Sequence, residues 1–182
     1  MHELILGGAK SGKSRCAETR AAHWLALPGH GAVLVATAMA GDDEMRARIE
    51  RHRADRAARV PGLATREEPR ALAAVLREES LPGRMVVVDC LTLWLTGLLM
   101  PLDGAPVDDP AAEVDALVDA LAAARGPVVL VSNEIGLGVT PMSRQARRFV
   151  DELGRLHQRV AAASTRVTLM VAGLELPLKG PR

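Results

Sequence analysis

The sequence predicts an α/β fold in which helices cover both faces of a mostly parallel sheet. Short, nearly continuous runs of Val, Leu and Ile alternate with longer segments whose apolar residues lie three and four positions apart. This is the pattern of buried parallel strands joined by amphipathic helices. The chain has 182 residues, fewer than the ~250 to 300 at which a single core usually splits. We therefore expect a single domain over residues 1–182.

The elements can be assigned in chain order. The runs expected to form buried strands occupy residues 3–8, 32–38, 84–89, 127–133 and 166–173. Helical spacing covers residues 13–27, 43–59, 69–79, 110–125 and 143–164. Residues 64–67 and 174–179 are candidates for edge strands, and the segment 101–110, rich in Pro and Asp, is expected to be a surface loop.

Composition limits the partners of this protein. Lys plus Arg number 23 against 22 Asp plus Glu, so a formal charge of +1 gives no overall field that would hold DNA or an anionic membrane surface. Aromatic residues are only 2% of the chain, which leaves almost nothing on which bases could stack. We expect no nucleic-acid partner, and any bound anion must be held locally.

The amino terminus and the cysteines indicate a cytoplasmic, soluble protein. Cys16 and Cys90 lie far apart and form no metal-ligand spacing, so neither a disulfide framework nor a zinc site is indicated. The apolar run at the start is only a few residues long, whereas a signal peptide needs ~7 to 15. No run approaches the ~18 apolar residues that indicate a membrane span.

A complete phosphate-binding motif, G-x-x-x-x-G-K-[ST], directly follows the first predicted strand and opens a helix. Its glycines let successive backbone N–H groups point at phosphate oxygens, with the positive end of the helix behind them. We expect Lys13 to reach the β- and γ-phosphates and Ser14 to help hold Mg²⁺. The alternative, a glycine-rich turn with a surface lysine, is disfavoured because motif, strand and helix coincide. The motif comprises Gly7, Gly8, Ala9, Lys10, Ser11, Gly12, Lys13 and Ser14.

Two acidic residues follow predicted strands, at the end where ligands collect in open α/β sheets. Asp89 closes the run 84–89 and is the candidate acidic partner of the metal, although an Asp there also suits a helix N-cap before Leu91. Glu134 follows the run 127–133 and is equally suited to act as a base, contact substrate or cap a loop.

His52 has an unusual setting for a surface histidine. Arg48 and Arg56 lie one helical turn on either side of it in the predicted helix 43–59. Guanidinium groups beside an imidazole disfavour its protonation, and the neutral imidazole is the form that attacks phosphorus. The same arginines would stabilise charge on a transferred phosphate. Residue types alone favour the other interpretation, an arginine-rich solvated face with an incidental histidine.

The chain resembles, almost from end to end, the bifunctional adenosylcobinamide kinase/adenosylcobinamide-phosphate guanylyltransferase family of cobalamin biosynthesis. The stretches that carry the resemblance are ILGGAKSGKSRCAE, VATA, DDEMRARIERHR, EEP, VVVDCLTLWLTGLL, LVSNEIGLGVTP and RQARRFVDELGRLHQRVAA. Most of them lie outside the phosphate loop, so the resemblance is specific. Two positions depart from the expected pattern: His157 replaces an Asn, and Lys10 replaces an Arg, which keeps the charge but loses the bidentate fork.

The resemblance implies two reactions on a P-loop, RecA-like, mostly parallel sheet. In the first, ATP or GTP phosphorylates the aminopropanol hydroxyl of adenosylcobinamide. In the second, GTP gives GMP to a histidine with loss of pyrophosphate, and the GMP passes to the cobinamide phosphate to form adenosyl-GDP-cobinamide. A small-molecule kinase in which His52 is structural, and a nucleotide-gated regulator, are the rival hypotheses.

The resemblance also assigns residues. The guanylylated histidine falls on His52, Mg²⁺ is expected at Ser14 and Asp89, and the implied assembly is a homotrimer. Nucleotide contacts fall on Gly7 to Ser14, Ala36, Thr37, Ala38, Arg53, Ala54, Asp55, Arg56, Glu67 and Asp89.

Overall fold

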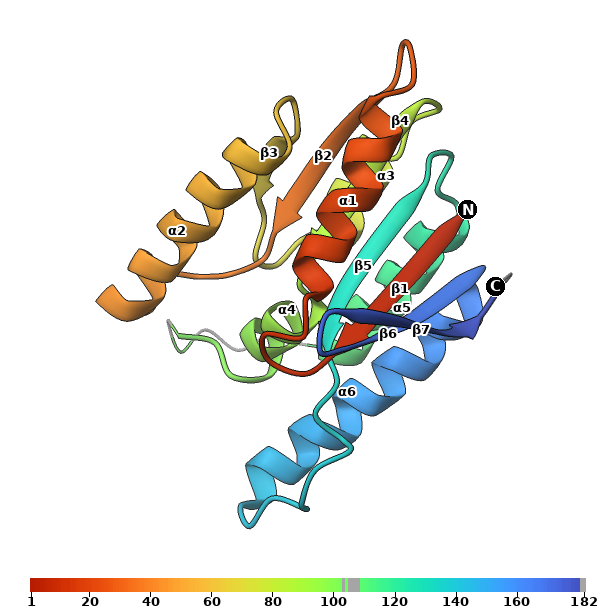
Figure 1. Ribbon diagram of the computed structural model, residues 1–182. Coiled ribbons are helices and arrows are strands. Elements are labelled where there is room, and N and C mark those ends of the chain that lie inside the picture. The colour runs from red at the N-terminus through yellow and green to blue at the C-terminus, as the bar shows by residue number, and fades with distance from the viewer. Residues whose placement is uncertain (103, 105–108, 181–182) are drawn as a thin grey trace.

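A computed structural model describes residues 1–102, 104 and 109–180. Within them, all five predicted buried strands and both candidate edge strands are present (Figure 1). The predicted loop 101–110 lies partly outside the described residues. The strands are β1 (His2–Gly7), β2 (Gly31–Ala36), β3 (Ala64–Glu67), β4 (Arg84–Asp89), β5 (Val128–Asn133), β6 (Arg166–Val171) and β7 (Leu174–Lys179).

The strands form one sheet in the order β3-β2-β4-β5-β1-β6-β7. The neighbours from β3 to β6 pair in parallel, and β7 returns antiparallel to β6 at the edge. The register places Gly7 beside Asn133, and Ala36 beside both Asp89 and Glu67. Because parallel strands end at the same edge, the phosphate loop and the candidate acidic residues meet at the carboxyl edge of the sheet.

The described helices include α4, which is absent from the helices predicted by apolar spacing and was considered only through the alternative of Asp89 as an N-cap before Leu91. α4 has the sequence LTLWLTGLL, which is apolar around most of its circumference and is largely buried, so no single stripe marks it as amphipathic. Its N-cap is Cys90, so the structure does not support the N-cap interpretation of Asp89. The helices are α1 (Lys13–Leu25), α2 (Asp43–Arg59), α3 (Leu72–Glu79), α4 (Leu91–Leu99), α5 (Pro110–Ala122) and α6 (Arg144–Ala163).

Two apolar layers hold the sheet between helices (Figure 1). On one face, small residues of α1 such as Ala17 and Ala21 pack against Ile5 and Val87. On the other face, α3 to α6 cover the sheet, with Trp94 completely buried among leucines and valines. In the described part of the chain, none of the helices combines the length and apolarity that a bilayer crossing requires.

Candidate functional site

The phosphate loop is a tight turn between β1 and α1. Gly12, the residue that precedes α1, has a φ of 100°, which favours glycine. Gly7 leaves no room for a side chain, because an added Cβ would lie 2.4 Å from Ser11 Oγ and 2.7 Å from the Met170 carbonyl oxygen. The chain therefore needs glycine at both ends of this loop.

Hydrogen bonds fasten the loop to neighbouring strands. The backbone N–H of Gly173, in the β6–β7 turn, donates to the Ser11 carbonyl at 3.0 Å, and that of Glu134 donates to the Gly7 carbonyl at 3.0 Å. Lys13 is only 9% exposed, and its Nζ donates to the Gly8 carbonyl at 2.8 Å. The lysine ammonium thus lies across the loop, beside the backbone groups that would surround a phosphate.

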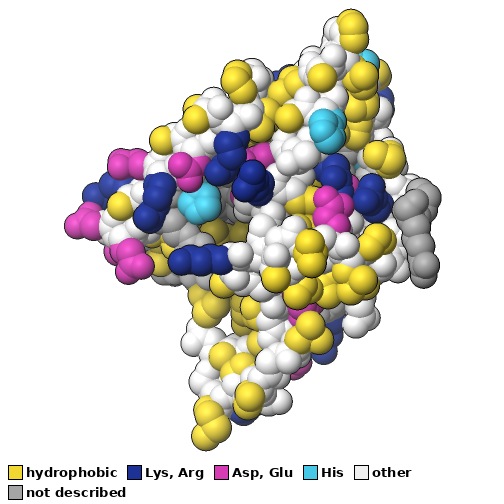
Figure 2. Space-filling model, in the orientation of Figure 1, with side chains coloured by type: hydrophobic (Ala, Val, Ile, Leu, Met, Phe, Trp, Pro, Cys, Tyr) yellow, Lys and Arg dark blue, Asp and Glu magenta, His cyan; other side chains and the backbone are white. Residues whose placement is uncertain are grey.

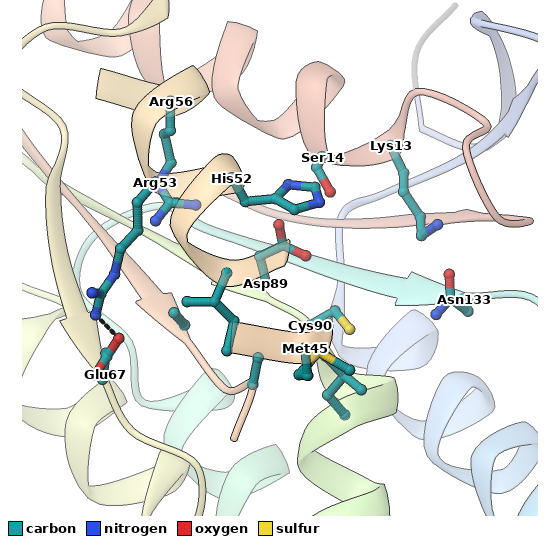
Figure 3. A pocket seen from close by; sticks show the side chains of 14 residues that line it. Lys13, Ser14, Met45, His52, Arg53, Arg56, Glu67, Asp89, Cys90 and Asn133 are labelled. Carbon is teal, nitrogen blue, oxygen red and sulfur yellow. Dashed lines mark hydrogen bonds and ion pairs between the residues drawn. The ribbon is translucent and has the colours of Figure 1, made fainter. Parts of the chain in front are cut away.

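An open cleft with a volume of about 200 Å³ adjoins the loop (Figure 3). Its walls come from the start of α1, the carboxyl ends of β2 to β5, the start of α4 and one face of α2. In Figure 3 the side chains of Ser14, His52 and Asp89 lie close together in the middle of it. The lining residues are Lys13, Ser14, Ala36, Ala38, Met45, Ile49, His52, Arg53, Arg56, Glu67, Asp89, Cys90, Leu93 and Asn133.

Helix α2 brings His52 to this cleft. Its start is fixed by Asp42, whose carboxylate accepts a 2.7 Å hydrogen bond from the Met45 N–H. Met45, Ile49 and His52 follow at intervals of four and three residues, so they lie on one helix face, and all three line the cleft. Most side chains of α2 are exposed, and His52 itself is exposed to solvent. The side chain of Arg48 lies outside the described part of the chain.

Two arginines of α2 meet the ends of β3 and β4. Arg53 forms an ion pair with Glu67 at the rim of the cleft (Figure 3). Arg56 is 6% exposed, and burial lowers its pKa while the charges of Asp89 and Glu18 partly oppose that shift. An arginine remains protonated at neutral pH, so the cleft holds a largely desolvated positive charge. In Figure 2, basic side chains gather around the hollow beside α2.

The chemistry available at the cleft is anion binding, metal binding and nucleophilic attack. Ser14 and Asp89 supply hard oxygen ligands, and Mg²⁺ usually takes only one or two protein ligands besides phosphates and water, so this pair fits the ion. No group of three or more His, Cys, Asp or Glu suited to a metal occurs among the described residues. Burial raises the pKa of the Cys90 thiol to about 11, so this cleft-lining cysteine is protonated.

Some predicted site residues lie elsewhere. Thr37 is 1% exposed, and its hydroxyl donates to the Cys90 carbonyl at 2.7 Å and accepts from the Cys90 N–H at 2.9 Å. Ala54 and Asp55 do not line the cleft, and Asp55 lies 3.9 Å from Arg59 in an ion pair. Of the phosphate loop, Lys13 and Ser14 face the cleft directly.

The carboxylate of Glu134 contacts other groups of the protein. Its carboxylate accepts a 2.7 Å hydrogen bond from the Gly136 N–H and lies 3.6 Å from His157 Nδ1. The other ring nitrogen of His157 is 2.7 Å from Ser132 Oγ. The alternative in which Glu134 caps a loop is therefore the one that its contacts support, and His157 belongs to the same buried polar group.

Several cleft residues were not predicted. Asn133 ends β5 next to Glu134, and the same rule that singled out Glu134, a polar residue at a strand's carboxyl end, would have found it. Met45, Ile49 and Leu93 are apolar residues whose pattern is the same as that of core residues. Sequence alone gives no signal that they line a cleft.

Comparisons with a family model and with known proteins agree on one family. Residues 3–178 match the family described as cobinamide kinase / cobinamide phosphate guanyltransferase, CobU. The chain is 52% identical over 180 residues to the bifunctional adenosylcobalamin biosynthesis protein CobP of Pseudomonas aeruginosa, with 99% of this chain and 98% of the relative covered. It is 37% identical over 188 residues to the bifunctional adenosylcobalamin biosynthesis protein CobU of Escherichia coli, with 97% and 98% covered.

Solved structures support the fold. One solved ATPase domain superposes with a TM-score of 0.51 and 13% identity over 92% of this chain and 68% of that one. The flagellar accessory protein FlaH of Methanocaldococcus jannaschii gives a TM-score of 0.50 and 13% identity over 98% and 78%. The predicted P-loop, RecA-like sheet is thereby confirmed, and at this identity the likeness extends to the fold alone.

Proposed function

Since the chain belongs to the cobinamide kinase / cobinamide phosphate guanyltransferase family, we propose that it is a bifunctional enzyme of adenosylcobalamin biosynthesis. It phosphorylates the aminopropanol hydroxyl of adenosylcobinamide with ATP or GTP, then transfers GMP from GTP to that phosphate. The observation that carries the proposal is that a phosphate-loop lysine, Lys13, and a histidine, His52, line one cleft. A simple kinase needs the first and has no use for the second.

In the kinase step, the phosphate loop and Lys13 hold the β- and γ-phosphates while the acceptor hydroxyl attacks the γ-phosphorus. Lys13 is already turned across the loop by its 2.8 Å bond to the Gly8 carbonyl, so it can exchange that contact for a phosphate oxygen. Ser14 and Asp89 are the residues that would hold Mg²⁺, which supplies charge neutralisation on the phosphates when bound. The bond from the γ-phosphorus to the β–γ bridging oxygen breaks as the new O–P bond forms, so the products are the corrinoid phosphate, a nucleoside diphosphate and the proton of the hydroxyl, which passes to solvent.

In the transfer step, a ring nitrogen of His52 attacks the α-phosphorus of GTP. An N–P bond forms, and the bond from the α-phosphorus to the bridging oxygen breaks to release pyrophosphate. A phosphate oxygen of the corrinoid then attacks the same phosphorus, and His52 leaves. Arg56 and Arg53 supply positive charge near the phosphates in both displacements.

The nucleotide site that we propose extends from the loop along the ends of β2, β3 and β4. Support comes from the cleft lining, which includes Lys13, Ser14, Ala36, Ala38, Arg53, Arg56, Glu67 and Asp89. Gly7 to Gly12 would contribute backbone N–H groups. Thr37, Ala54 and Asp55 complete the proposed set, with their roles limited to backbone contacts or to support of neighbouring side chains.

The decisive experiment is incubation with GTP labelled at the α-phosphate and mapping of the modified residue by mass spectrometry. We expect acid-labile GMP on His52, none in His52→Ala, and a large loss in Lys13→Ala because triphosphate binding is weakened. Label that persists in His52→Ala would contradict the covalent mechanism. Lys13→Ala with unchanged affinity for nucleotide would contradict the shared phosphate site.

We further propose a cytoplasmic homotrimer. Exposed apolar side chains on the β5–α6 connection and on β7 support self-association, since Leu137 is 83%, Val139 96% and Leu174 73% exposed. Cys16 and Cys90 are free thiols, which is consistent with a reducing compartment. Light scattering on the eluted protein tests the assembly, and a monomer mass would reject it.

A further inference from the structure

A second, apolar groove opens beside the nucleotide cleft. It lies between the segment that leads into α2 and one side of α4, and its volume is about 180 Å³. Met45 and Leu93 line both spaces, so the groove is continuous with the cleft. We call it the acceptor groove; its other apolar walls are Met39, Met100 and Leu102.

The face of α2 changes character along its length. Arg53 and Arg56 lie at one end with the acidic ends of β3 and β4, whereas Met45 and Ile49 lie at the other with Leu93 of α4. His52 lies between the two halves, seven residues from Met45, or about two helical turns. The half of the face with the arginines suits a phosphorylated group, and the half with Met45 and Ile49 suits an uncharged, apolar group.

The lining of the acceptor groove suits a bulky, irregular apolar surface. Three methionines, Met39, Met45 and Met100, line it, and their unbranched side chains adapt to irregular shapes. Asp42 is the acidic residue in the lining, and its carboxylate accepts a 2.7 Å hydrogen bond from the Met45 N–H. Leu102 is 66% exposed at the mouth, so its side chain is available to a ligand.

We propose that the acceptor groove binds the methyl-bearing rim of the corrinoid that adjoins its aminopropanol arm. The inference rests on the proposed function and adds to it the place of the second substrate. A groove of this size takes the rim and not the whole macrocycle. The arm then runs past Met45 and Leu93 into the cleft, which brings its terminal oxygen toward the phosphate loop and His52.

Two substitutions that leave the catalytic groups in place test this site. Leu102→Asp puts a charge at the mouth, and Gly97→Leu fills the groove from α4. The matched control for the second is Gly97→Ala, whose Cβ would meet Met39 Cε and the Pro69 carbonyl oxygen at ordinary distances of 3.7 Å. Leu27→Asp is the control for the first, since Leu27 is 46% exposed and follows α1 at the opposite end of the sheet.

We expect both groove variants to raise the KM for adenosylcobinamide about tenfold in the kinase reaction, a range typical of apolar pocket changes. Guanylylation of His52 by GTP alone, and the KM for nucleotide, should match the wild type and the controls. Unchanged corrinoid KM in both variants overturns the groove assignment. A raised KM for nucleotide instead assigns the groove to the base and also overturns it.

The same experiment separates this inference from the proposed function. If the wild-type protein does not phosphorylate the corrinoid, the proposed function fails and the groove assignment with it. If the wild type turns over the corrinoid and the groove variants equal it, only the groove assignment fails. If Gly97→Leu does not fold, Leu102→Asp alone decides, because its side chain is exposed.

Discussion

Gly7 has no space for a side chain, and substitution there should destabilise the protein. In Gly7→Ala, the new Cβ would lie 2.4 Å from Ser11 Oγ and 2.7 Å from the Met170 carbonyl oxygen. The serine side chain can rotate away, but the carbonyl belongs to β6, which pairs with β1 at this position. The strands must therefore shift. Such overpacking costs about 1 to 3 kcal/mol, which lowers Tm by roughly 2 to 12 °C in a chain of this size.

Gly8 provides the matched control, because a Cβ there meets nothing within 4 Å. Thermal unfolding followed by circular dichroism should place Gly8→Ala within about 2 °C of the wild type, as for an unconstrained surface change. Affinity for GTP should fall in Gly7→Ala, since the loop that would hold the phosphates is displaced. Equal Tm values for the two variants would refute the steric argument.

Three further predictions follow from buried polar groups. Burial raises the pKa of the Cys16 thiol to about 12 and that of the Cys90 thiol to about 11. Iodoacetamide at about pH 8 should therefore leave both cysteines of the native protein unmodified and alkylate both in urea, which mass spectrometry would detect. Burial lowers the pKa of His157 below 6.5, so the unfolded chain takes up its proton first and the free energy of unfolding should fall as the pH drops below about 6.5. Urea unfolding at about pH 7.5 and 5.5 should show a smaller difference in His157→Asn. Glu3 is 3% exposed and accepts bonds from Arg20 at 3.0 Å and from Thr168 at 2.8 Å, so Glu3→Ala should lower the free energy of unfolding by about 3 kcal/mol, as urea titration would measure.

Local signals in the sequence account for most of the fold. The strands are unbroken apolar runs, and the phosphate loop is marked by glycines whose backbone geometry the motif requires. Apolar spacing did not predict helix α4, because nearly all its sides are apolar and buried and it therefore lacks the stripe by which an amphipathic helix is recognised. The sequence predicts that ligands collect at the end of β5 and indicates Glu134 there, whereas in the structure it is the neighbouring Asn133 that lines the cleft.

The cleft was less predictable, because its lining depends on where α2 lies. Helical periodicity places Met45, Ile49 and His52 on one face but does not say what that face meets. In the structure it meets α4 and the ends of the strands, which turns two apolar side chains into walls of the cleft. Thr37 was expected to contact nucleotide, but its hydroxyl hydrogen-bonds to the backbone of Cys90. The two residues are 53 positions apart in sequence, so the local pattern around Thr37 gives no sign of this contact.

One cleft suffices for both proposed reactions because the acceptor is the same molecule before and after its phosphorylation. The kinase step requires its terminal hydroxyl near the phosphates held by Lys13, and the transfer step requires the resulting phosphate near the nucleotide carried by His52. Both Lys13 and His52 line the same space, and the acceptor groove joins it through Met45 and Leu93. A corrinoid rim held in that groove would keep its position while the end of the arm gains a phosphate. The charge balance of +1 is compatible with this arrangement, since the positive groups proposed to bind phosphate, Lys13, Arg53 and Arg56, all line the cleft.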